Sequence, residues 1–255
     1  RLHDLRLSDN SGRGIAFLAP NSTTVLAERV QVDGGMEYGI YLPDGGSAAI
    51  GCQVSNLSTT GPLIGINAAL VRDCTVRNLS GAGYLAGINA VQVESCVVVN
   101  IVAVGGSGVG GAWFSIQANQ VHDCAVRHLR YSNGLGWGIF ANNNNGTITG
   151  CHVEDVEHSG VYFVGIQGGV VRDCQLDQVK FTGTNTNGYG ITAVIAEDSA
   201  VGSVSTEGGY FAGIAASRVK GCYVASVTGA GGSLHGIKGT TVENNTVVGV
   251  RSCGI

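Results

Sequence analysis

A phrase with a central cysteine recurs along the chain: "VRDCTVRNL" starts at residue 71, "VHDCAVRHL" at 121 and "VRDCQLDQV" at 171. Alignment on this cysteine places an equivalent residue, the anchor, every 22 to 28 residues across the 255-residue sequence. The anchors are Leu5, Val30, Cys52, Cys74, Cys96, Cys124, Cys151, Cys174, Ser199, Cys222 and Asn245. Eleven repeats of about 24 residues predict a repeat architecture over residues 1–255 and leave no room for a separate domain.

Two further columns support this alignment. The residue two positions after the anchor is Leu or Val in all eleven repeats, and a small residue followed by Ile recurs from Gly14-Ile15 to Gly254-Ile255. The apolar segments are short, β-branched and alternating, whereas long helical periodicity is missing and glycine occupies 42 positions. We therefore expect three short strands in each repeat, each pairing with its equivalents about 4.8 Å above and below.

The segment "VENNTVVGV" (242–250) and the Gly-Ile columns resemble the repeats of right-handed parallel β-helix proteins, the pectin-lyase-like superfamily. The resemblance covers the whole chain and matches no specific enzyme family. It implies an all-β fold, a right-handed parallel β-helix of about eleven coils. Members of that family often carry stacked asparagines at the bend before the last strand. This chain keeps Asn245 there and has cysteine at most equivalent positions.

Seven of the eight cysteines fall in the anchor column, and we interpret them as a structural packing stack. Leu5, Val30 and Ser199 share the column, so its common property is a small or medium side chain that suits an interior. Disulfides are a weaker alternative because stacked Cβ atoms would be spaced too widely, and a straight stack does not converge on a metal. The predicted structural residues are Cys52, Cys74, Cys96, Cys124, Cys151, Cys174, Cys222 and Asn245.

The residue after each Gly-Ile isoleucine is expected to face outward in an amide-rich column. Variable segments at 102–115, 130–138 and 180–190 bring aromatic residues, Tyr131 among them, to the same side. In pectin-lyase-like enzymes the equivalent sheet and its loops form the substrate groove, so the resemblance implies contact with a polysaccharide. The predicted ligand-binding residues are Asn67, Asn89, Gln117, Gln167, Thr192, Trp113, Trp137 and Tyr189. The alternative is that the amides stack as ladders and the aromatic side chains only cover the loops.

A charged column lies two residues before the anchor. From Arg72 onward opposite charges tend to adjoin, as in the pair Arg72–Glu94 and the series Arg172, Glu197, Lys220 and Glu243. Such cross-strand pairs contribute about 0.2–1 kcal/mol each, so we interpret this column as a solvated face that helps to set the register.

Catalytic residues are not identifiable from the sequence. Glycoside hydrolysis generally requires two carboxylates across the scissile bond, and the amide column contains none. The densest acidic patch is "VEDVEH" (153–158), whose Glu154, Asp155 and Glu157 are a weak calcium candidate at one bend, with Asp177 one coil away. The alternative interpretation of this patch is a solvated turn.

Composition limits the remaining function classes. With a net charge of −4 and 13% charged residues, the chain lacks the basic footprint of a nucleic-acid-binding protein. Its apolar runs are shorter than the roughly 20 residues of a membrane-spanning helix, and no cofactor is implied. The chain begins and ends inside a repeat, which suggests a segment of a longer chain or an assembly with end-to-end self-association.

The leading functional hypothesis is an extracellular or cell-envelope β-helix that contacts polysaccharide without identifiable catalysis. One alternative is a structural or filament-forming solenoid. Another is a polysaccharide lyase whose catalytic residues are not recognised.

Overall fold

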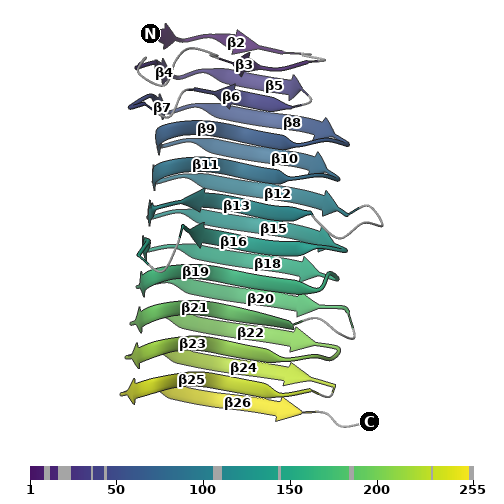
Figure 1. Cartoon of the computed structure of the whole chain (residues 1–255), viewed down its shortest axis with the longest axis vertical. Coiled ribbons are helices and arrows are strands. Elements are labelled where there is room, and N and C mark those ends of the chain that lie inside the picture. The colour runs from purple at the N-terminus through teal and green to yellow at the C-terminus, as the bar shows by residue number, and fades with distance from the viewer. Residues whose placement is uncertain are drawn as a thin grey trace.

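The described part of the chain is a stack of parallel β-coils without a helix (Figure 1). The computed structural model describes residues 1–8, 12–16, 24–35, 37–42, 45–105, 111–142, 145–183, 187–230 and 232–252. The strands form two sheets that extend along the long axis of the molecule, from β1 and β2 at one end to β25 and β26 at the other. This arrangement confirms the predicted β-solenoid, although many coils, such as β9–β10 and β19–β20, hold two long strands instead of the three short strands expected.

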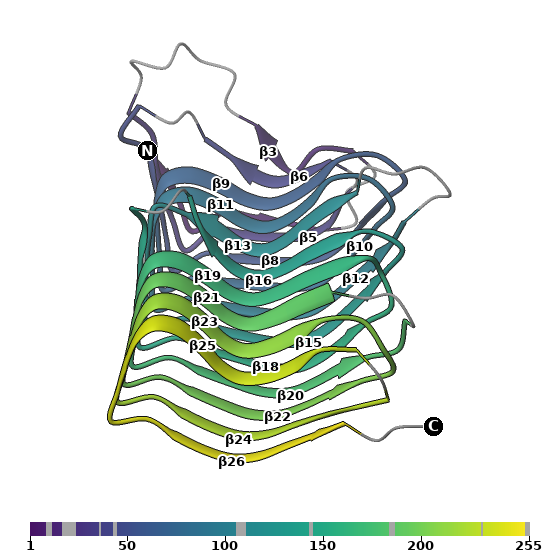
Figure 2. The ribbon, with the colours of Figure 1, turned by 60° about the horizontal axis from the view of Figure 1, so that its bottom comes forward.

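The first sheet carries the Gly-Ile column. Its strands are β1 (Leu2–His3), β3 (Ile15–Ala16), β4 (Leu26–Glu28), β6 (Tyr38–Tyr41), β7 (Ala48–Ile50), β9 (Leu63–Arg72), β11 (Leu85–Glu94), β13 (Ala112–Ala118), β14 (Gln120–His122), β16 (Leu135–Ala141), β17 (Thr147–Thr149), β19 (Tyr162–Arg172), β21 (Asn187–Glu197), β23 (Phe211–Lys220) and β25 (Leu234–Glu243). Figure 2 shows its long strands crossing one face of the stack and turning down one side.

The second sheet closes the opposite face of the stack (Figure 2). Its strands are β2 (Arg6–Leu7), β5 (Gln31–Gly35), β8 (Gln53–Thr59), β10 (Thr75–Gly81), β12 (Val97–Val104), β15 (Ala125–Ser132), β18 (His152–His158), β20 (Gln175–Phe181), β22 (Ala200–Thr206), β24 (Tyr223–Gly229) and β26 (Thr246–Ser252). These eleven strands in the described residues correspond to about ten complete turns.

The strand register confirms both aliphatic columns. The residues two after the anchor pair coil by coil from Leu7 to Val247, and the isoleucines pair from Ile15 to Ile237. The final pair, Gly254-Ile255, lies outside the described residues. Both columns face the interior, so the core is continuous along the stack. Burial of this apolar surface, rather than local propensity, fixes the coils at their common register.

Glycine precedes the isoleucines because the interior is crowded there. A Cβ on Gly65 would lie 2.4 Å from the carbonyl oxygen of Gly87 in the next coil. It would also lie 2.7 Å from Cγ1 of Val76 on the opposite sheet. Both separations are shorter than ordinary van der Waals contact, so the small residue lets the two sheets approach each other.

The residue just before each anchor forms the bend between the two sheets. All eleven of these residues have positive φ, including Asp73, Asp123 and Asp173 of the recurring phrase, with φ values of 54°, 53° and 51°. Asp, Asn and Gly tolerate the left-handed region better than other residues, which explains the acidic residue before the cysteine. The bend turns the chain from the first sheet into the second.

The anchor cysteines are buried and form no disulfide among the seven described, as predicted for a structural stack. Each also hydrogen-bonds, which the sequence did not indicate. The backbone N–H of Cys74 donates to Sγ of Cys96 in the next coil at 3.5 Å, and the Cys74 thiol donates to the carbonyl of Arg72 at 3.1 Å. Asn245 completes the series, accepting from the N–H of Cys222 at 2.7 Å and donating to Val219 at 3.0 Å.

The predicted charged column is in register, although its ion pairs differ in part. Arg172 contacts Glu197 with an Nε–Oε2 distance of 2.7 Å, as predicted. Arg72 aligns with Glu94, but its Nε lies 3.7 Å from Asp73. The column therefore sets few specific pairs, and their stabilising effect is small because at least one side chain of each pair is about half exposed.

Candidate functional site

The small residue and the Ile of each Gly-Ile pair both face the interior, so the alternation of the first sheet is interrupted there and sets which aromatic side chains reach the surface. The residue directly before the small residue of the Gly-Ile pair points outward, and the residue before that points inward. Trp113 aligns with Leu85 and is fully buried, with Nε1 donating to the carbonyl of Gly83 at 2.9 Å. The prediction that Trp113 is an exposed ligand contact is therefore wrong. Its neighbour Phe114 takes the outward position, aligned with Trp137.

Tyr131 is also buried, contrary to the sequence prediction. It lies on β15 with 2% of its surface exposed, and its hydroxyl is 2.8 Å from Ser115 Oγ. Ser115 takes the place of glycine in the Gly-Ile column of the same region. Tyr131 is therefore a core residue whose polar end is satisfied inside the molecule.

The outward positions of the first sheet carry a continuous series of aromatic rings, which we call the aromatic stripe. Its members are Tyr84, Phe114, Trp137, Tyr162, Tyr189, Tyr210 and His235. Most are partly exposed, and Phe114 is the most covered, with 8% exposed. They come from successive coils, so the stripe follows the long axis of the stack. Only Trp137 and Tyr189 were predicted from the sequence.

Each ring of the stripe contacts the next. Phe114 and Trp137 are stacked with centroids 4.8 Å apart and planes at 13°, and the other consecutive centroid distances lie between 5.4 and 6.1 Å. Aromatic pairs at such separations contribute about 0.5–1.5 kcal/mol beyond their buried area. The stripe is therefore a rigid surface whose ring positions are set by their neighbours.

The predicted amide column lies beside the stripe, in register from Asn67 to Lys238. Asn67 is only 4% exposed and accepts from Asn89 Nδ2 at 2.8 Å, so these two amides form a ladder. The prediction that Asn67 contacts a ligand is wrong because neighbouring residues cover it. This part of the column follows the alternative interpretation given above.

Farther along the same column, the amides bond to the rings. Gln117 Oε1 accepts from the Tyr84 hydroxyl, and Gln167 Oε1 accepts from Trp137 Nε1, both at 2.8 Å. Gln167 and Thr192 remain partly exposed beside the rings. These bonds direct the hydroxyl of Tyr84 and the indole N–H of Trp137 toward the amide column and fix the orientation of both rings.

The electrostatics of this surface are nearly neutral. Among the described residues from Tyr84 to Lys238, the outward positions of the stripe and the amide column include no carboxylate. Lys238 lies 5.4 Å from the Tyr210 ring centroid and donates to its hydroxyl at 3.3 Å. Burial raises the pKa of Tyr84 and of Tyr162, so both phenols stay protonated at neutral pH.

The acidic patch lies on the second sheet, in strand β18, rather than at a bend as predicted. Its carboxylates contact cations of neighbouring coils: Glu154 lies 2.8 Å from Arg127, and Asp155 lies 2.9 Å from Arg130. Glu157 is 3.7 Å from Lys180. The hydrogen bond from Arg130 lowers the pKa of the Asp155 carboxyl. Asp177 aligns with Glu154 one coil away, as predicted.

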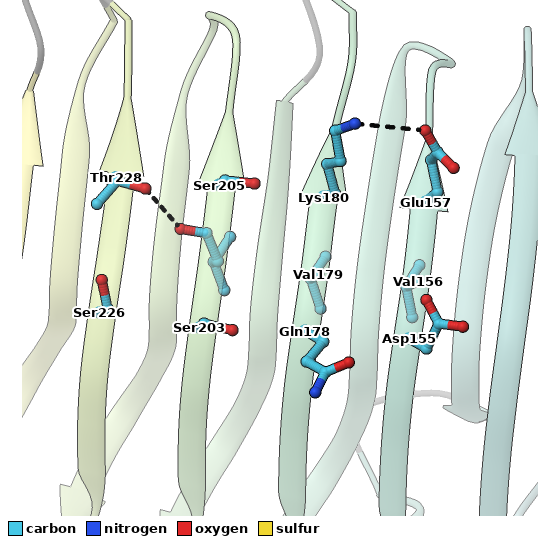
Figure 3. A pocket seen from close by; sticks show the side chains of 11 residues that line it. Asp155, Val156, Glu157, Gln178, Val179, Lys180, Ser203, Ser205, Ser226 and Thr228 are labelled. Carbon is cyan, nitrogen blue, oxygen red and sulfur yellow. Dashed lines mark hydrogen bonds and ion pairs between the residues drawn. The ribbon is translucent and has the colours of Figure 1, made fainter.

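These carboxylates do not converge on one point, and no group of three or more metal-binding side chains is found among the described residues. The patch instead borders a polar groove of about 280 Å³ (Figure 3). One row of outward side chains consists of Asp155, Gln178, Ser203 and Ser226, and the other of Glu157, Lys180, Ser205 and Thr228. The groove has no aromatic side chain, which distinguishes it from the first sheet.

The family of the chain follows from comparison with known proteins. The profile described as "Right handed beta helix region" matches residues 63–200, more than half of the sequence. The chain therefore belongs to the right-handed β-helix family, in agreement with the parallel stack of coils. No curated protein and no solved structure matches the chain. In the described residues, no helix is long and apolar enough to cross a membrane.

Proposed function

We propose that the protein binds a polysaccharide along the aromatic stripe of the first sheet. The observation that carries the proposal is the continuous series of contacting rings from Tyr84 to His235, all at least partly exposed except Phe114, with amide and hydroxyl groups along its edge. The C–H faces of sugar rings stack on aromatic faces, while their hydroxyls hydrogen-bond to polar groups at the rim. A surface with both features, extended along one axis, fits a linear polymer.

Rigidity supports the same proposal. Each ring is held by its neighbours, and Trp137 is further held by its bond to Gln167. A ligand therefore meets side chains that are already in position, so binding costs little conformational entropy. The proposal includes no catalytic step. It also implies a location outside the cell or in the cell envelope, where polysaccharides are displayed.

Intrinsic fluorescence tests the proposal directly. Trp137 is a partly exposed member of the stripe, whereas Trp113 is buried and serves as an internal reference. Titration with a panel of soluble glycans is expected to change the Trp137 emission. The Trp137→Phe variant, which keeps the Trp113 signal, should lose this response. If no glycan changes the emission, and calorimetry also finds no binding, the proposal is wrong.

A structural solenoid is the second candidate, and the amide ladders favour it. Asn100 donates to Asn78, and Asn78 donates to Asn56, both at 2.8 Å, in a ladder on the second sheet. Such ladders stabilise stacking without a ligand. In this case the aromatic stripe only reinforces the coils, and substitution of its rings would lower stability with no binding to lose. End-to-end association stays a prediction, which sedimentation velocity tests.

A further inference from the structure

From Trp137 to His235 the aromatic stripe has a repeat of two coils, which does not extend to Phe114 because Phe114 aligns directly with Trp137. One outward column, the tryptophan column, has Trp137, Val164, Tyr189, Ala212 and His235 in consecutive coils. Ring-bearing residues therefore alternate with small aliphatic ones. Since strands of adjacent coils lie about 4.8 Å apart, equivalent rings of this column recur roughly every 9.6 Å along the stack.

The neighbouring outward column alternates in the opposite phase. This tyrosine column has Leu135, Tyr162, Asn187, Tyr210 and Ser233 in the same five coils. Each coil therefore presents one ring of the stripe, in the tryptophan column for one coil and in the tyrosine column for the next. Val164 and Ala212 are fully buried although they point outward, because the larger neighbouring side chains cover them. The result is a zigzag of rings with a twofold repeat.

From this zigzag we infer that the ligand is an uncharged, flat glycan ribbon whose successive sugars are turned by half a revolution, as in β-1,4-linked chains. This inference rests on the proposed function and deepens it. In such a ribbon each sugar advances by about one coil spacing, and alternate sugars present the same face and edge. The polymer repeat, a disaccharide, then matches the two-coil repeat of the rings. Coiled chains, such as α-1,4- or β-1,3-linked glucans, lose this match after a few sugars.

The charge of the aromatic stripe indicates whether the flat glycan chain is neutral or anionic. The tryptophan and tyrosine columns contain no carboxylate between Trp137 and His235, and Gln167 and Thr192 beside them offer neutral hydrogen-bonding groups. The protein as a whole has a net charge of −4, so an anionic polymer would approach against repulsion. An uncharged ribbon suits both the neutral surface and the net charge.

The extent of the zigzag predicts a ligand length. Five consecutive coils, from Trp137 to His235, span about 19 Å, which corresponds to about five sugars at one per coil. Affinity is expected to rise with chain length up to about five or six sugars and then to level off. It should rise most where an added sugar reaches a further ring.

Calorimetric titration with hexasaccharides of three linkages tests the inference. A β-1,4-linked hexaose (of glucose or mannose) is expected to bind at least about tenfold more tightly than α-1,4- and β-1,3-linked hexaoses of glucose. Equal affinity for all three linkages would overturn the ribbon inference while leaving the proposed function intact. Failure of every glycan to bind would overturn both.

Variants locate the binding to the stripe. Tyr189→Ala removes a central ring and is expected to weaken β-1,4-hexaose binding on the order of tenfold. The matched control is Tyr223→Ala, because Tyr223 is a 42% exposed tyrosine on the second sheet. Tyr210→Ala gives an independent measurement if Tyr189→Ala does not fold, as judged by circular dichroism. Equal loss in Tyr223→Ala, or unchanged affinity in both stripe variants, would contradict the assignment.

Discussion

At the residue scale, the anchor column combines an apolar surface with a hydrogen-bond acceptor. The bend turns the N–H of Cys74 toward the interior, where Sγ of Cys96 accepts it. Hydrogen bonds with Cys52 and Cys96, together with burial, raise the pKa of the Cys74 thiol, so it stays protonated and unreactive. Ser199, which accepts from the N–H of Cys174 at 3.2 Å, has the same role with an oxygen. Ser199 and Asn245 share the column with the cysteines because each supplies an acceptor at the same place, whereas side-chain size alone was the property inferred from the sequence.

Replacement of one anchor residue should therefore lower the free energy of unfolding by more than the loss of its packing contacts alone would. In Cys96→Ala, the N–H of Cys74 loses its acceptor and a small cavity forms, so the free energy of unfolding should fall by about 1–3 kcal/mol. Cys96→Ser keeps an acceptor, as at Ser199, and should lose less. Urea denaturation of the two variants measures the difference. Greater loss in the serine variant would show that packing alone decides this position.

His158 is a second buried residue, and its burial makes the stability of the fold depend on pH. It is fully buried among the rings of Tyr131, Phe163 and Phe181, and within the described residues neither ring nitrogen has a hydrogen-bond partner. Burial lowers the pKa of His158 from 6.5 to about 4. The unfolded chain therefore binds a proton at a higher pH than the folded protein does. The contribution of neutral His158 to the free energy of unfolding is fully present above pH 6.5. It is lost as the pH falls toward 4, and the loss is roughly 3 kcal/mol in total.

The His158→Phe variant separates this contribution from the other titrating groups. Phenylalanine fits an aromatic environment and cannot be protonated, so the variant should keep its stability between pH 6.5 and 4 better than the natural protein. Thermal unfolding at several pH values, compared between the two proteins, provides the measurement. The same loss of stability in both proteins would mean that His158 is solvated or paired in solution.

At the element scale, much of the architecture could be predicted from the sequence. The eleven-fold repeat, the parallel register and the cysteine stack follow from columns of residues that must share one environment. The side on which each aromatic residue lies was not predicted, because strand alternation is interrupted at each Gly-Ile pair, where both residues face the interior. Both Ser115 and Ile116 face the interior, so a strict count back from Ile116 would place Trp113 outside and Phe114 inside, opposite to the structure.

The cross-coil hydrogen bonds were harder to predict. Whether Gln167 bonds to Trp137 or to solvent depends on rotamers of two side chains from different coils. Likewise, Arg130 aligns with Glu157 in the register but also contacts Asp155, a residue with a positive φ of 52°. Sequence columns define neighbours along the stack but not such diagonal contacts. The candidate site was therefore predicted as a region, while its exact membership required the structure.

The glycine before the isoleucine tests how closely the two sheets must approach. Gly65→Ala places a methyl group against the Gly87 carbonyl oxygen and Val76, so the free energy of unfolding should fall by about 1–3 kcal/mol. Gly61→Ala is the matched control, because its Cβ would have only ordinary contact, 3.7 Å from Thr59 Oγ1. The control should change stability by less than about 0.5 kcal/mol. Equal effects in denaturant titrations would contradict the close-packing explanation.

At the scale of the whole molecule, the two sheets present different surfaces. The second sheet displays paired charges and hydroxyls around the groove of Figure 3. On the first sheet, the aromatic stripe and the amide column carry no carboxylate among the described residues, and the charged column lies at the other end of the strands. Both surfaces extend along the same axis because every coil repeats the same positions. In a solenoid, a residue type that recurs at one position of the coil forms a line of side chains along the stack. For this reason the proposed ligand is a polymer that lies along the stack.

This separation of charge predicts how binding responds to salt. Because the proposed glycan and the aromatic stripe carry no opposing charges, screening should have little effect, even though the Debye length falls from about 10 Å at 0.1 M to about 3 Å at 1 M salt. The dissociation constant for a β-1,4-hexaose is expected to change by less than about twofold over this range. Lys238→Ala should leave this insensitivity unaltered, because the lysine contacts Tyr210 and no charged partner is required. A steep loss of affinity with salt that disappears in Lys238→Ala would instead identify an anionic polymer as the ligand.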